Sequence, residues 1–163
     1  MRTAAFTIVL SVVVLLLHTA VVKFLAIGTI APDIVLLWII YLSIRRNQMV
    51  GTAAGFFLGL TLDLLSGSDG MLGLAALSKT VAGFSAGYFY NENKTFQTLG
   101  GYQFIIVVVL VSFVHNAIYF VIFLQGTQLN WADALLYYGI PTTAYTTAFG
   151  LLPMFAVARK HLS

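Results

Sequence analysis

Four side chains whose functional groups could take part in chemistry lie inside otherwise apolar stretches of this 163-residue sequence: Asp63, Lys79, His115 and Asn116. A carboxylate, an ammonium, an imidazole and an amide could together bind a small solute or a metal ion, or move a proton. The sequence has no cysteine, and it carries no HExxH, Walker or GxGxxG pattern. Thiol chemistry is therefore excluded, and the usual metal and nucleotide signatures are missing. We expect no catalytic residue, no cofactor and no bound metal.

The elements that must position these side chains are membrane helices. The chain is 60% hydrophobic and only 8% charged, against about 25% charged residues in soluble domains. Its apolar runs are continuous rather than alternating, which favours helices over a barrel. Nucleic acid is not an expected partner, because the basic residues flank the apolar runs instead of forming one face with interleaved aromatic residues. The sequence predicts an all-α integral membrane protein.

The apolar runs predict one transmembrane domain, residues 1–163, with about six helices. A spanning helix needs about 20 residues, so the second run is short, and a re-entrant segment that leaves five full spans is the alternative. Pro32 and Asp33 limit where that second helix can begin. The candidate spans are residues 4–22, 34–44, 50–65, 71–90, 101–124 and 135–158.

Most basic residues of the termini and loops fall on one side of the predicted membrane spans, and most acidic residues fall on the other. The first side carries Arg2, Arg45, Arg46, Lys94, Arg159 and Lys160 with the single acid Glu92, and the second carries Lys23, Asp33, Asp69 and Asp133. Because positively charged loops stay in the cytoplasm, both termini are predicted to be cytoplasmic. A six-span count satisfies this pattern without exception.

Glycines at intervals of four predict a tightly packed helical hairpin. The third run carries Gly51, Gly55, Gly59 and Asp63 on one helix row, and the fourth answers with Lys79, Gly83 and Gly87. Only a short turn, residues 66–70, joins the two runs, so the helices should be antiparallel neighbours whose backbones approach closely.

Asp63 and Lys79 are the natural partners within this hairpin. At 1.5 Å per residue their Cα atoms would differ in depth by roughly 7 Å, which a lysine side chain can span. A solute or proton site built on the pair is one interpretation, and an ion pair that locks the hairpin is the one we favour. Further along the chain, the polar residues His115, Asn116, Thr142 and Thr146 are expected to make interhelical hydrogen bonds.

The middle of the chain resembles the family of the rod shape-determining protein MreD. The resemblance rests on Pro32-Asp33 before an apolar helix, then on Gly55-Phe56-x-x-Gly59-Leu60-x-x-Asp63-x-x-Ser66-Gly67 and the turn glycine Gly70. It extends over nearly the whole chain, although only residues 32–87 are specific. Lys79 and the loop at residues 91–94 lie outside the family pattern, so the resemblance does not support the expected ion pair.

The resemblance implies a non-enzymatic, multi-pass protein of the bacterial inner membrane within the cell-elongation machinery. It implies association with MreC and, through the complex, with the MreB filament and the peptidoglycan polymerase and transpeptidase. It also implies a fold similar to the substrate-binding subunits of energy-coupling-factor transporters. We therefore expect a scaffold, surrounded by membrane lipid, that binds the transmembrane helix of MreC in a groove of glycine and threonine faces. The alternative is a subunit that captures a vitamin or metal through Asp63, Lys79, His115 and Asn116.

Overall fold

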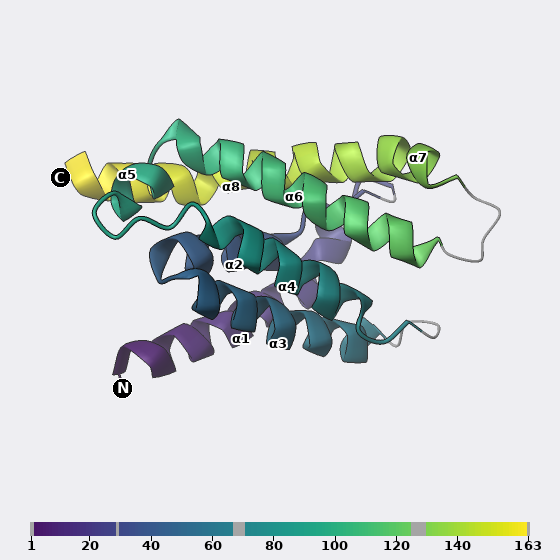
Figure 1. Cartoon of the computed structure of the whole chain (residues 1–163), viewed down its shortest axis with the longest axis horizontal. Coiled ribbons are helices and arrows are strands. Elements are labelled where there is room, and N and C mark those ends of the chain that lie inside the picture. Colours follow the sequence, from purple (N-terminus) through teal and green to yellow (C-terminus); the bar gives the residue numbers. More distant parts are fainter. Residues whose placement is uncertain (1, 29, 67–70, 125–129, 163) are drawn as a thin grey trace.

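The computed structural model describes residues 2–28, 30–66, 71–124 and 130–162. Every regular element in these ranges is a helix, and the one β-bridge is an isolated contact between Ile27 and Ile30. The long helices lie side by side along one axis of the molecule (Figure 1). The prediction of an all-helical membrane protein is confirmed.

The observed helices follow the predicted apolar runs, with some differences at their ends. The fourth helix is shorter than predicted, and the short helix α5 was not predicted. The last run, predicted from residue 135, begins with a π-helix, and one turn of α-helix that was not predicted precedes it. The elements are α1 Arg2–Leu25, α2 Ile34–Arg45, α3 Gln48–Ser66, α4 Leu74–Gly87, α5 Thr95–Leu99, α6 Tyr102–Phe123, α7 Trp131–Ala134, the π-helix η1 Leu135–Gly139 and α8 Ile140–Leu162.

Three of these helices are long and apolar enough to cross a membrane, through the windows Ala5–Val22, Gln48–Leu65 and Tyr102–Phe123. At 1.5 Å per residue, α2 with 12 residues and α4 with 14 are about 18 and 21 Å long. Both lengths fall short of the roughly 30 Å of a bilayer's hydrocarbon core. Helix α8 has the length, at 23 residues, but carries four threonines near its start. The count of six spans therefore stays a prediction.

Helix α2 is the centre of the bundle. It contacts α1, α3, α4, α5, α6 and α8, and Val35, Ile39, Ile40 and Ile44 are completely buried. A helix that is apolar on all sides is stable only where other elements surround it. This explains how a helix too short to span a bilayer comfortably is still part of the structure: protein, rather than lipid, covers most of its surface.

Helices α3 and α4 form the most extensive helix pair, through their glycines. A Cβ atom at Gly55 would collide with the Lys79 carbonyl, one at Gly59 with the Ala75 backbone, and one at Gly83 with the Gly51 carbonyl. The two backbones are thus in direct contact, as the glycine spacing predicts. Gly51 also abuts Ser43 of α2, and Gly87 meets the Gln48 side chain at the start of α3. Gly67 and Gly70 of the family motif lie outside the described residues.

The π-helix before α8 has a local cause. Pro141 lacks a backbone N–H, so a regular α-helical bond cannot form at that point and its ring needs extra room. The chain widens instead, and the N–H of Ile140 donates to the Leu135 carbonyl five residues back. The Gly139 carbonyl accepts a bond from the Thr143 hydroxyl at 2.8 Å. The widened turn thereby presents a carbonyl to the neighbouring helix α6.

Candidate functional site

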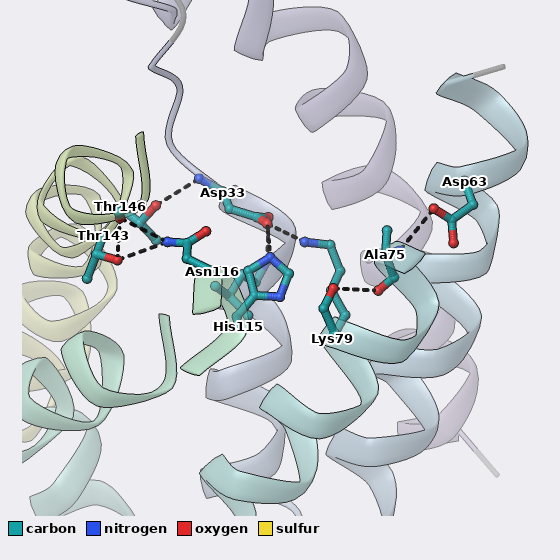
Figure 2. A network of polar contacts seen from close by, with 11 residues as sticks. Asp33, Asp63, Ala75, Lys79, His115, Asn116, Thr143 and Thr146 are labelled. Carbon is teal, nitrogen blue, oxygen red and sulfur yellow. Dashed lines mark hydrogen bonds and ion pairs between the residues drawn. The ribbon is translucent and has the colours of Figure 1, made fainter. Parts of the chain in front are cut away.

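Asp33 lies at the centre of a polar cluster inside the bundle (Figure 2). It caps the N-terminus of α2, where its Oδ1 accepts a hydrogen bond from Leu36 N at 2.8 Å. Its own N–H donates to Thr146 Oγ1 of α8 at 3.0 Å. Its second oxygen, Oδ2, forms an ion pair with Lys79 Nζ of α4 and lies 3.6 Å from His115 Nε2 of α6. Through its carboxylate and its backbone N–H, this one residue joins four helices.

Lys79 pairs with Asp33, and this corrects the pairing with Asp63 expected from the sequence. The Lys79 side chain is only 4% exposed and points from α4 toward the start of α2 (Figure 2). The sequence interpretation treated Asp33 as a loop charge outside the bundle, because it follows Pro32 at the end of a connection. Pro32 is in fact fully buried, and α2 begins deep enough for its capping carboxylate to meet a lysine of the interior.

Asp63 has a different role: it caps helix α4 from the neighbouring helix. Its Oδ2 accepts bonds from Gly73 N at 3.1 Å and Ala76 N at 3.0 Å, and its Oδ1 accepts one from Ala75 N at 3.0 Å. The first N–H groups of a helix have no intrahelical partner and carry partial positive charge. Gly73 occupies the N-cap with φ +97°, a conformation that favours glycine, and supplies no capping side chain. Asp63 takes over that function, and both of its oxygens are engaged at the start of α4 rather than with Lys79.

A second histidine, His18 of α1, belongs to the surroundings of this cluster. It is half-buried and close enough to Asp33 and Lys79 to interact with their charges. The sequence interpretation assigned His18 no role, since a single histidine in an apolar helix has no pattern that reveals its neighbours. The proximity of His18 to Asp33 follows only from the packing of α1 against α2, whose N-cap is Asp33.

The polar residues of α6 and α8 meet beside the cluster. Asn116 Nδ2 donates to Thr143 Oγ1 at 2.9 Å and to the Gly139 carbonyl at 3.2 Å. Thr146 is almost fully buried and accepts from the Asp33 backbone, whereas Thr142 is half-buried beside it. The structure thus places His115, Asn116 and Thr146 in interhelical contacts, with Thr143 in the role expected for Thr142.

The polar groups in and beside this cluster form hydrogen bonds and an ion pair with one another and hold the helices of the core together. Its two carboxylates are held by helix N-termini and by a lysine, and its amide by a hydroxyl and a carbonyl. Within the described ranges, no group of three or more histidine, cysteine or acidic side chains could hold a metal ion. Buried charges persist in an apolar interior only when they are paired and hydrogen-bonded. We therefore interpret these residues as the link that fixes α2, α4, α6 and α8 together.

Two lateral grooves lie elsewhere on the molecule, and neither is lined by Asp33, Lys79 or His115. The larger has a volume of about 880 Å³ and runs between α1, α2 and α8. The smaller, about 530 Å³, separates α6 from α8. We call them the α1/α2/α8 groove and the α6/α8 groove. The second is lined by Val109, Leu110, Phe113, Ile140, Thr143, Ala144 and Thr147.

Comparison with known families identifies a match over nearly the whole chain. The family described as rod shape-determining protein MreD matches residues 1–157 of the 163-residue chain. Searches of curated proteins and of solved structures returned no significant match. The expected likeness to the substrate-binding subunits of energy-coupling-factor transporters therefore remains a prediction.

Proposed function

The chain belongs to the MreD family of rod shape-determining proteins, and on this premise we propose that it is a multi-pass inner-membrane scaffold that binds the transmembrane helix of MreC. Through MreC it would be connected to the MreB filament and to the peptidoglycan polymerase and transpeptidase. Its contribution to cell shape would be assembly of these components rather than chemistry, in keeping with a polar core whose charges already serve helix termini and each other.

The binding surface we propose is the α6/α8 groove, and this groove is the observation that supports the proposal best. Of the glycine and threonine faces expected to receive a partner, the glycine face is covered, because Gly55, Gly59 and Gly83 lie within the α3–α4 contact. Part of the threonine face remains accessible: the half-buried Thr147 and the exposed Ala144 line the α6/α8 groove, and the buried Thr143 lies at its base.

The side chains of this groove suit a helix as the bound partner. Ala144 lines the groove, and Ala148, outside the lining, is also exposed and four residues further along α8, so the two lie one above the other on the helix surface. Small residues at this interval let a second backbone approach closely, which is what stabilises helix pairs where lipid offers no hydrophobic driving force. On the opposite wall, Leu110 and Phe113 of α6 are 51% and 44% exposed and provide packing surface.

Charge placement supports the proposed orientation in the inner membrane. Arg45 and Arg46 end α2, Lys94 precedes α5, and Arg159 lies near the end of α8. Figure 1 places α5, the start of α1 and the end of α8 at the same end of the bundle. Basic residues concentrate on the cytoplasmic side of membrane proteins, so both termini would be cytoplasmic.

Affinity purification from membranes in a mild detergent tests this function. The tagged protein should recover MreC, and its depletion should make rod-shaped cells round. Filling the groove with Ala144→Trp should reduce MreC recovery, whereas Phe57→Trp on the exposed face of α3 should not. Absence of MreC from the purified material, together with normal rods after depletion, would refute the proposal.

A further inference from the structure

The α1/α2/α8 groove is the larger of the two grooves described above, and the proposed partner site does not use it. The outer face of α2, from Ile34 to Arg46, forms its floor, α1 forms one wall, and residues 149–157 of α8 form the other. Helices α1 and α8 both contact α2 but do not pack against each other along this stretch. The lining is apolar except at one end, where Arg45 and Arg46 lie.

The two arginines at that end are positioned but not neutralised. The Arg45 guanidinium lies 5.8 Å from the centre of the Tyr41 ring and 5.4 Å from that of Phe96. Arg46 Nη2 donates to Thr7 Oγ1 of α1 at 3.3 Å. Neither arginine forms an ion pair with a carboxylate of the described ranges. Guanidinium groups held in this way match the geometry of a phosphate.

The floor of the groove, next to Arg45 and Arg46, is about as long as the acyl chains of one lipid leaflet. Its floor, α2, is about 18 Å long, close to the roughly 15 Å of one leaflet's hydrocarbon. Its far end is closed, because the Tyr145 hydroxyl of α8 donates to the Leu25 carbonyl at the end of α1 at 2.9 Å. The α1 wall extends further, from Phe6 to Leu25, so the two arginines at one end, rather than the length, favour a phosphate headgroup over a helix. Acyl chains that end at the bilayer midplane need only the part of the groove that α2 floors.

We infer that the α1/α2/α8 groove binds an anionic phospholipid of the cytoplasmic leaflet. The headgroup phosphate lies between Arg45 and Arg46, and the acyl chains lie along α2. Basic pockets between membrane helices on the cytoplasmic side bind acidic headgroups in this manner. The lipid fills the gap between α1 and the rest of the bundle, where α1 is otherwise held by few polar contacts, such as Trp38 Nε1 with Ser11 Oγ at 2.8 Å. This site is independent of the proposed MreC surface.

Trp38 offers a direct readout, because it lines the groove and the chain has only two tryptophans. In a Trp131→Phe background, the protein alone is reconstituted in phosphatidylcholine bilayers that contain a small fraction of either brominated phosphatidylglycerol or brominated phosphatidylcholine. Bromine in the acyl chains quenches nearby tryptophan fluorescence. At equal mole fractions, phosphatidylglycerol should quench Trp38 more strongly.

A charge-matched pair of double variants separates the groove from general surface charge. Arg45→Gln with Arg46→Gln should abolish the preference for phosphatidylglycerol, with a loss of about fivefold in relative affinity for each arginine. Lys94→Gln with Arg159→Gln removes the same charge at the same end of the molecule and should preserve it. Three results would overturn the inference: equal quenching by both lipids, no quenching by either, or an equal loss of preference in both double variants.

Discussion

Both aspartates of the family motif act at the N-terminus of a helix. Asp33 caps its own helix α2 and holds Lys79 with its other oxygen, and Asp63 caps α4 across the hairpin. In a bilayer these N–H groups have no water to satisfy them. A carboxylate in such a position neutralises exposed donors and the helix dipole together. The primary role of these two intramembrane carboxylates is therefore structural: they stabilise helix N-termini.

Removal of the Asp63 carboxylate should destabilise the hairpin. Asp63→Ala leaves three N–H groups, one buried and two half-buried, without this acceptor and should lower the free energy of unfolding by roughly 3 kcal/mol. Asp63→Asn retains one acceptor oxygen and should lose less. Thermal or denaturant unfolding in detergent measures both, with the exposed Asp133→Ala as control. If Asp63→Ala and Asp133→Ala have equal effects, Asp63 does not cap α4.

The ion pair itself is tested by a double-mutant cycle. Lys79→Met leaves the Asp33 carboxylate without its cation and should cost about 3–5 kcal/mol in unfolding free energy. Asp33→Asn keeps the cap, because asparagine is also a good N-cap residue. Combining the two changes should cost clearly less than their sum. The pair Asp63→Asn with Lys79→Met should instead be additive within about 0.5 kcal/mol, and the opposite pattern would restore the pairing with Asp63.

At this scale the sequence indicates which polar residues are buried but not which of them meet. Lys79 has an acid in its own hairpin and another, Asp33, 46 positions away in the chain, and spacing favours the first. In the structure Lys79 pairs with Asp33 instead, because the first N–H groups of α4 donate their hydrogen bonds to Asp63. Gly73 occupies the N-cap in a left-handed conformation and has no side chain to cap α4, and this position cannot be recognised from the residue type alone.

Among the elements, the glycine spacing predicts the α3–α4 contact and the apolar runs predict the long helices. The short elements are harder to foresee. Helix α5 has only five residues, too few for a periodic pattern. The π-helix before Pro141 is a local response of the backbone to proline. The length of α2 is predicted correctly, but its central position depends on contacts with six other helices.

A matched pair of glycine substitutions tests the close approach of α3 and α4. Gly55→Ala places a methyl group against the Lys79 backbone, so the helices must separate at a cost of about 1–3 kcal/mol. Gly150→Ala meets only side chains, at 3.4 Å or more, and gains up to about 1 kcal/mol of helix propensity. Unfolding measurements should rank Gly55→Ala below the wild type and Gly150→Ala at or above it. Tolerance of both would show that the α3–α4 backbones are farther apart than described.

On the scale of the whole molecule, the protein presents a fixed core and two separate lateral grooves. The core is fastened by charges that join α2, α4, α6 and α8, so both walls of the α6/α8 groove belong to helices that these contacts hold together. One groove offers small and hydroxylated side chains, and the other an apolar channel with arginines at one end. This division suits a scaffold that holds a protein partner and a lipid at once.

Site-specific disulfide formation tests the central claim, that MreC binds along the α6/α8 groove. The chain has no native cysteine, so Ala144→Cys provides a single thiol in the groove. Phe57→Cys provides a matched control on α3, which contacts neither α6 nor α8. Disulfides require Cα atoms less than about 7 Å apart. Mild oxidation with single cysteines along the MreC transmembrane helix should link Ala144→Cys to positions three or four apart and leave Phe57→Cys unlinked. Links only to Phe57→Cys, or equal links to both, would contradict the account.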